Sequence, residues 1–273
     1  MITAGATVPR TGSDQLADDA PAAGGGRPSG GTFASPVDHG FYRWTAIAAF
    51  TVVVVGFART YYLRLLFGAP ALPWLLHLHG ALMTSWFALF FVQTSLIAAH
   101  RARLHKRLGI LGGVLAGLIV VVATTVALHG AARELHRPTT GGPPPLQFMG
   151  FILIVLLVFA ILVGAALLLR RRRDWHKRLM LLSCLSMTGP GLTRIPPQWF
   201  HAFAFLKTGG PTGLFGLDLV LVYACVAWDT WRYRRLHPAF VCGALLIVAY
   251  DLPFIWMFLS SATWTRIATW LVS

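Results

Sequence analysis

The segment FMGFILIVLLVFAILVGAALLLRRRRDWHKR, residues 148–178, decides the fold class of this chain. Its first part, 148–169, is an uncharged apolar run, and four consecutive arginines follow at 170–173. A helix rises about 1.5 Å per residue, so this run is long enough to cross a hydrocarbon layer of about 30 Å. The segment therefore predicts a membrane-spanning helix that ends in a basic loop.

Comparable apolar runs lie on both sides of this segment, at 44–66, 73–98, 108–128, 178–200, 214–231 and 239–259. The chain is 56% hydrophobic and only 12% charged, whereas about a quarter of the residues in a soluble domain are charged. We therefore predict an all-α, polytopic integral membrane helical bundle of about seven transmembrane helices over residues 44–273. Gly189-Pro190-Gly191 makes the run at 178–200 the most irregular, because proline removes a backbone donor.

Residues 1–43 differ in composition from the rest of the chain. They are rich in Gly, Pro, Ala, Ser and Asp, a composition that buries too little apolar surface to offset the entropy lost on ordering. They also lack the apolar stretch of a secretory signal peptide. We expect a disordered cytoplasmic tail.

Arginine and lysine collect in three loops, at 100–107, 170–178 and 232–237. Cytoplasmic loops of membrane proteins carry an excess of these residues. We therefore expect a bacterial-type inner or plasma membrane, with the amino terminus in the cytoplasm and the carboxyl terminus outside. The net charge of +14 then reflects these loops, and the expected partner is the lipid bilayer and no nucleic acid.

A tetrad of residues occurs twice, as His105-Lys106-Arg107-Leu108 and as His176-Lys177-Arg178-Leu179. Each copy opens an apolar span after a basic loop. The copies could mark a repeated helical hairpin or only the common preference for basic residues at cytoplasmic helix starts. If His105 and His176 face each other, they could supply two axial imidazoles to a b-type haem. Histidines that bind water or lipid headgroups are the alternative.

Ionisable side chains inside the predicted spans are candidates for function because they are costly in lipid. Counting along the helices places a layer of them in the outer half of the membrane: Arg59, His77, His79, Arg194, Asp218 and Asp251. We expect Arg194 to pair with Asp218. His77 and His79 are two positions apart and point in nearly opposite directions on a helix, so at most one faces the interior. No metal site is predicted.

Three functions remain open from the sequence. The first is a redox or respiratory-assembly protein that binds b-type haem or a quinone through His79, His105 or His176, with respiratory-chain components or a second copy as partner. The second is a proton-coupled small-solute transporter that uses the outer layer beside Asp251-Leu252-Pro253. The third is a non-catalytic membrane scaffold or lipid-interacting protein, whose arginine runs would contact anionic lipids. Whether the chain is an enzyme is left undecided.

Several other functional classes are excluded because the sequence lacks the residues that they require. The lysines are Lys106, Lys177 and Lys207, none inside a predicted span, so a retinal Schiff base is excluded. No Walker loop or His-Glu-x-x-His motif occurs. Cys184, Cys225 and Cys242 all lie in apolar runs, where a thiol is usually inert, so we expect no disulfide.

Overall fold

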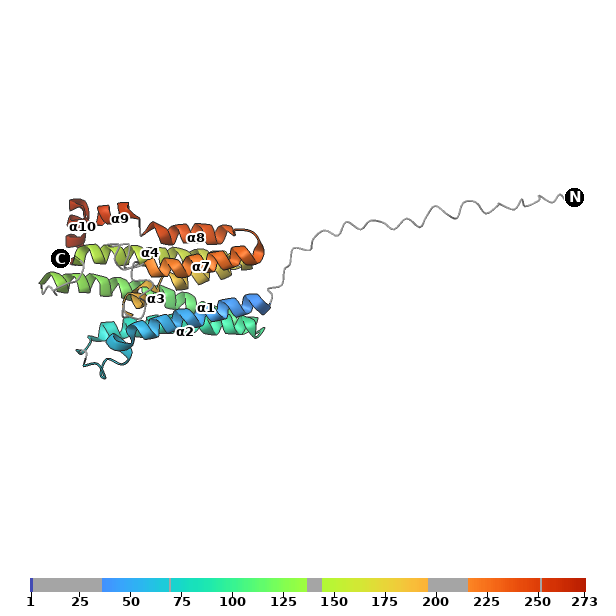
Figure 1. Cartoon of the computed structure of the whole chain (residues 1–273), viewed down its shortest axis with the longest axis horizontal. Helices are drawn as coiled ribbons and strands as arrows, with labels where there is room; N and C mark the ends of the chain where they lie inside the picture. Colours follow the sequence, from blue (N-terminus) through green and yellow to red (C-terminus); the bar gives the residue numbers. More distant parts are fainter. Residues whose placement is uncertain (2–35, 69, 137–143, 196–215, 251) are drawn as a thin grey trace. The chain divides into compact units, whose positions relative to one another are not determined.

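A computed structural model of the chain describes residues 1, 36–68, 70–136, 144–195, 216–250 and 252–273 (Figure 1). The described residues form helices and turns, without a strand. Five segments are long and apolar enough to cross a membrane: Asp38–Tyr62, Trp74–Ala98, Ala102–His136, Pro145–Leu168 and Pro238–Leu259. The chain is therefore all-helical, as the sequence predicts, and these segments indicate a multi-pass membrane protein.

The first helix begins earlier than the sequence predicts. α1 spans Pro36–Phe57 and continues into a π-helical turn, η1, at Ala58–Tyr62, whereas the apolar run begins at Trp44. Asp38 lies in the first turn, where a carboxylate interacts favourably with the helix dipole. Asp38 and Tyr42 are both buried. Composition misplaces this boundary because the first two turns are polar in sequence and become buried only when the helices pack.

The next three helices follow the predicted spans. α2 is Trp74–Ala98, α3 is Ala102–His136 and α4 is Pro145–Leu168, and each packs against the helix before it (Figure 1). α3 extends beyond the predicted 108–128 at both ends, because its polar first and last turns are also helical. The tetrad that contains His105 opens this helix, as predicted.

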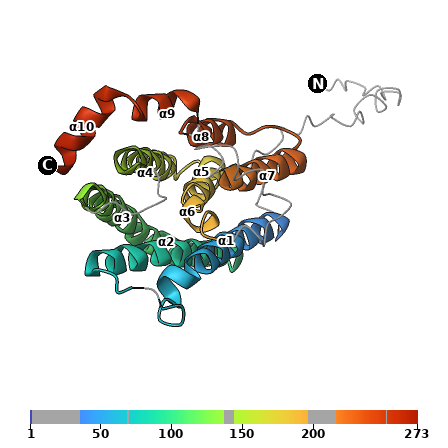
Figure 2. The same cartoon turned by 60° about the vertical axis from the view of Figure 1, so that its left-hand side comes forward.

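The described part of the predicted span 178–200, residues 178–195, lies in short helices and turns in the middle of the bundle. α5 is Arg173–Leu185 and α6 is Gly189–Leu192, and α1 to α4, α7 and α8 surround them (Figure 2). Side chains from every side of α5 are buried, among them Leu181, Ser183 and Cys184. The helix is interrupted just before Gly189-Pro190, as the sequence predicts. Residues 196–200 lie outside the described part of the chain.

The remaining helices are α7 at Gly216–Tyr233, α8 at Pro238–Ala249, α9 at Pro253–Leu259 and α10 at Ala262–Val272. The last predicted span is divided, because α8 ends at Ala249 and α9 begins at Pro253, whereas the sequence indicated a clear interruption only in the run at 178–200. α10 was not predicted, and the Trp264 indole donates to the Leu146 carbonyl at 2.9 Å, which fixes it to α4. α7 is not one of the five membrane-length segments, so the count of seven spans stays a prediction.

α1 and α6 meet at a pair of glycines. A Cβ atom built on Gly56 would lie 2.1 Å from the Gly191 carbonyl oxygen, and one on Gly191 would lie 3.2 Å from the Val52 carbonyl oxygen. Small residues let helix backbones approach this closely. The broken central helix is therefore seated directly against the backbone of α1.

Replacing Gly56 by alanine should lower the free energy of unfolding by about 1–3 kcal/mol, the usual cost of overpacking, because the backbone of α6 cannot move away. Thermal unfolding of the purified protein in detergent measures the change. Gly40→Ala is the matched control in the same helix, since a Cβ there meets nothing within 4 Å. Equal unfolding temperatures for the two variants would contradict this contact.

Candidate functional site

A network of charged side chains joins the helices at the end of the bundle where α1, α3, α5 and α8 begin and α7 ends. We call this the basic end. Ring contacts across it join His39 to His100, His105 to His176 and Trp175 to His237, with centroids 6.1, 6.3 and 5.7 Å apart. Residues from distant parts of the sequence are thus brought to one site.

The two tetrad histidines lie side by side. His105 and His176 are each the fourth residue of their helix, and their ring planes are inclined at 86°. His176 Nδ1 lies 2.8 Å from the Ala166 carbonyl oxygen. A carbonyl only accepts, so Nδ1 carries the proton and Nε2 is left to accept a proton or bind a metal. The bond to Ala166 also fixes the orientation of this ring.

The other half of the pair contains polar atoms without partners. Nδ1 of His105 and Oε1 of Gln93 are buried and have no hydrogen-bond partner among the described residues. The backbone carbonyl of Gln93 lies close enough to interact with the His105 imidazole. Gly109 faces the side-chain Nε2 atom of Gln93. Buried polar atoms are almost always bonded, so these two atoms at the α2–α3 interface are groups that a bound ligand would satisfy.

A buried ion pair lies two residues further along α5. Arg178 donates from Nε and NH2 to the two carboxylate oxygens of Asp229 in α7, at 3.0 and 2.8 Å. Its NH1 donates to the Asp174 carbonyl at 3.0 Å. The side chains of Arg178 and Asp229 are 3% and 1% exposed. This two-point geometry satisfies both charges and is the strongest way to join the two groups.

A second buried carboxylate joins α1 to the same network. Tyr233 donates to Asp38, and Lys177 Nζ lies 3.9 Å from Asp38 and 3.3 Å from the Tyr233 hydroxyl. Burial, followed by repulsion from the neighbouring guanidinium of Arg178, lowers the pKa of the Lys177 ammonium. α1, α5 and α7 are thus held together by charged side chains at the basic end.

His237 ends the network at the start of α8. Its Nδ1 accepts from the Ala239 amide at 3.1 Å, which caps the helix. The side chain is buried against Trp175. Burial, and then the positive charge of Arg178, lower the pKa of His237. The neutral imidazole is therefore the form that the folded protein favours.

Two predicted residues of the outer layer lie near each other. Arg194 donates to the Pro190 carbonyl at 2.7 Å and stacks over Phe57, with 4.5 Å to the ring centroid. Its charge also acts on His79. The predicted partner of Arg194 was Asp218, whose side chain lies outside the described residues, so that pairing stays a prediction.

The rest of the predicted layer is dispersed. Arg59 is exposed and lies over Phe67, and His77 is exposed beside Tyr61. His79 is partly buried, so the two α2 histidines do differ in environment. Asp251 lies outside the described residues. The described residues of the layer therefore do not form one site. Arg194 and His79 are the two members that interact electrostatically.

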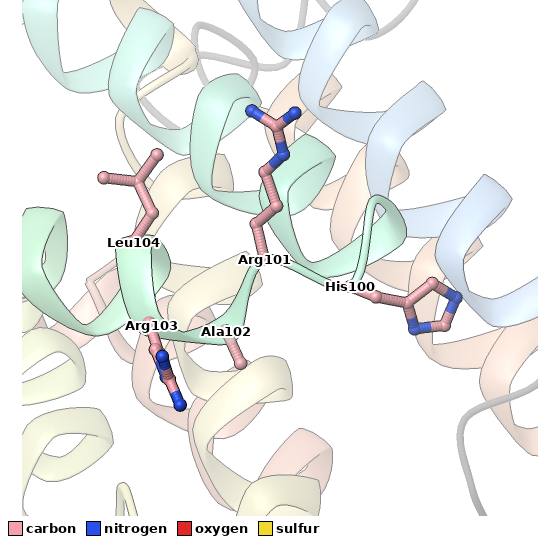
Figure 3. Close-up of a pocket in the computed structure, with 5 residues that line it drawn as sticks. All are labelled: His100, Arg101, Ala102, Arg103 and Leu104. Atoms are coloured by element: carbon pink, nitrogen blue, oxygen red, sulfur yellow. The ribbon is translucent and has the colours of Figure 1, made fainter.

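A hollow of about 530 Å³ lies at the turn between α2 and α3, lined by His100–Leu104 (Figure 3). Arg101 and Leu104 extend to one side of the chain, while Arg103 extends to the other (Figure 3). The hollow does not bring the two guanidinium groups together. It is therefore not a site for a small anion held between them.

Sequence reasoning missed several residues of the basic end: Asp38, Tyr42, Gln93, Asp229 and Tyr233. Asp38 lies within residues 1–43, whose composition indicates a tail, so the sequence gives no reason to place its charge inside the bundle. Asp229 lies within the predicted span 214–231, where a carboxylate beside a basic loop was a usable signal. Tyr42 and Gln93 carry no sequence signal, because only packing makes their polar atoms buried. The Tyr42 hydroxyl likewise has no hydrogen-bond partner among the described residues.

Comparisons of this chain with protein families, with curated proteins and with solved structures found no match. The described residues also contain no group of three or more His, Cys, Asp or Glu side chains that could hold a metal ion. The functional argument therefore depends on the geometry of the basic end.

Replacing Asp229 by alanine should lower the free energy of unfolding by about 3–5 kcal/mol, because Arg178 is left buried without its counter-charge. Thermal unfolding in detergent measures the loss. Asp174→Ala is the control, since that carboxylate is 63% exposed and its loss should cost less than about 1 kcal/mol. The double change Arg178→Met with Asp229→Leu should recover most of the stability. A cost for Asp229→Ala no larger than the control's would contradict the assignment.

Stability should fall as the pH drops below about 6.5, the ordinary pKa of histidine. The pKa of His237 is lowered in the folded protein, so the unfolded chain binds the proton more tightly. The neutral His237 side chain therefore makes its full contribution to stability above about pH 6.5. This contribution declines as the pH falls from there to the lowered pKa of His237 in the folded protein. His237→Asn keeps a capping oxygen and should remove this part of the pH dependence, measured as unfolding temperature at pH 5.5 and 7.5. An unchanged pH profile would count against it.

Proposed function

We propose that this chain is a membrane redox protein that binds b-type haem through His105 and His176. The observation that supports it is the separation of 6.3 Å between the two ring centroids. An imidazole nitrogen lies about 2.1 Å from a bound metal and about 1 Å from its own ring centroid, so two imidazoles on opposite sides of one metal have centroids about 6 Å apart. The distance therefore suits two ligands of one iron.

The hydrogen bonds of the pair support the same proposal. Metal-ligating histidines usually donate their other ring N–H to a carbonyl or carboxylate, which fixes the tautomer. His176 makes such a bond to Ala166. His105 has a buried Nδ1 without a partner among the described residues. Haem would supply one-electron chemistry, and these residues would hold and orient it.

The proposal includes an orientation. The three basic loops would face the cytoplasm, and residues 178–200 and α7 would complete seven crossing segments with the five of membrane length. The site would then lie near the cytoplasmic surface. Respiratory-chain components or a second copy of the chain would exchange electrons with it there.

The helix breaks favour a second candidate, a proton-coupled small-solute transporter. Helices are interrupted between α5 and α6 and again between α8 and α9. Transporters place their binding sites at discontinuous helices. Arg194, which follows α6, and His79 would belong to such a site.

Purified protein should show a Soret band and a sharp band on reduction, or gain both when haem is added. His105→Ala and His176→Ala should each remove at least half of the pigment. His129→Ala is the matched control, because His129 is an exposed histidine of α3 bonded to the Thr125 carbonyl. Absorption spectra of the oxidised and reduced protein measure the result.

A change of ligand tests the proposal without loss of the fold. His105→Met should keep the haem and raise its midpoint potential, since methionine with histidine is the axial pair that raises the potential. Protein that folds normally and never takes up haem would contradict the redox proposal. Proton-driven solute uptake by such protein in vesicles would favour the transporter instead.

A further inference from the structure

The surface of the basic end is strongly cationic. The three turns at this end, between α2 and α3, α4 and α5, and α7 and α8, and the helix ends beside them carry exposed basic side chains. They are Arg101, Arg103, Lys106, Arg107, Arg170, Arg171, Arg172, Arg173, Arg232, Arg234 and Arg235. In the same described turns, Asp174 is exposed, whereas Asp38 and Asp229 are buried in the network. Arg232 lies 4.0 Å from Asp38, and the other basic side chains of these turns outnumber the exposed carboxylate of Asp174, so the described surface is strongly positive.

Large apolar side chains are exposed beside these charges. Trp231 and Leu236 flank the arginines between α7 and α8, with exposed fractions of 66% and 54%, and Leu168 precedes the α4–α5 turn. Tryptophan and arginine together are typical of the membrane–water interface. The helices that begin or end here include segments of membrane length, and the ends of such helices are where lipid headgroups would meet the protein.

Two residues of this surface have an unusual backbone. His100 and Arg234 have φ values of 58° and 54°, and they are the non-glycine residues with positive φ in the described part of the chain. Each lies just after a helix, α2 and α7 respectively. Such positions usually hold glycine because a side chain strains the left-handed conformation. Strain of this kind persists mainly at functional positions.

The helix end at His100 is fully bonded despite that strain. The His100 amide donates to the Ile97 carbonyl at 3.0 Å and the Arg101 amide donates to the Leu96 carbonyl at 2.8 Å. This is the Schellman arrangement, in which glycine normally occupies the position of His100. Glycine would thus fit the backbone better, so the side chain at this position acts outside the helix, where the exposed His100 ring contacts His39 of α1 along one edge.

We propose that the basic end binds the phosphate groups of anionic phospholipids, and that the left-handed turns present Arg234 and His100 to those phosphates. Guanidinium groups bind phosphate through paired hydrogen bonds. Trp231 and Leu236 would lie against the glycerol and acyl regions of the same lipids. The choice of lipid over a soluble polyanion follows from the exposed apolar side chains, which a headgroup layer accommodates.

The test uses the full chain purified in mixed micelles that contain equal amounts of phosphatidylglycerol and phosphatidylcholine with the same acyl chains. Mass spectrometry of the retained lipid gives the ratio of the two. Each Lys or Arg near an anionic surface strengthens binding about fivefold, so the wild type should retain phosphatidylglycerol in clear excess. Arg234→Gly should reduce that excess about fivefold, and His100→Gly should reduce it by a smaller factor.

Glycine at these two positions keeps the test independent of folding. Arg234→Gly should unfold at the same or a higher temperature than the wild type, because glycine relieves the left-handed backbone. His100→Gly gains the same relief but loses the ring contact with His39, so its unfolding temperature should stay close to that of the wild type. Arg234→Lys should keep the lipid excess. Arg133→Gln, an exposed arginine in the last turn of α3, is the matched control and should change neither quantity.

Three results would overturn the proposal. The first is equal retention of the two lipids by the wild type. This is the result expected if the basic end binds an acidic protein and not anionic lipid. The second is an unchanged ratio in Arg234→Gly. The third is release of phosphatidylglycerol by inorganic phosphate at constant ionic strength, which would identify a free phosphate site.

Discussion

The structure depends on the ion pair between Arg178 and Asp229. Both side chains are almost completely buried, and a charge removed from water without a partner is far too costly for a stable protein. Each residue therefore requires the other, and α5 cannot rotate or slide without separating them. Asp38, Lys177 and Tyr233 extend the same constraint to α1. The position of the central helix is thus set by charge pairing as much as by apolar packing.

This constraint also positions the imidazoles. His176 and Arg178 are two residues apart, so they leave α5 in nearly opposite directions. While Arg178 is held against α7, His176 must point towards α3 and α4, where it finds the Ala166 carbonyl and His105. The histidine pair and the ion pair are therefore two sides of one helix. A change on one side is expected to be felt on the other.

Much of the architecture could be predicted from the sequence, because long apolar runs leave few alternatives. The runs at 73–98 and 148–169 correspond closely to α2 and α4, and the predicted interruption of the run at 178–200 lies just before Gly189-Pro190. The partners of the charged residues could not be predicted. Pairing depends on which helices become neighbours, and depth along a helix suggested Asp218 as a partner for Arg194, while Asp229 and Arg178 went unnoticed. The repeated tetrad predicted that His105 and His176 occupy equivalent positions. It did not reveal that Arg178, in the second copy, is buried whereas Arg107, in the first copy, is exposed.

The central place of α5 has a consequence for how the protein is made. A segment that opens with four arginines and is mostly enclosed by other helices has little to gain from partitioning alone into lipid from the translocon. It must enter together with α4, whose long apolar sequence inserts readily, and wait for α7 to supply Asp229. Biogenesis is then completed only when the carboxyl-terminal half of the chain has emerged from the ribosome, and a chain truncated before α7 would hold an unpaired guanidinium in its interior.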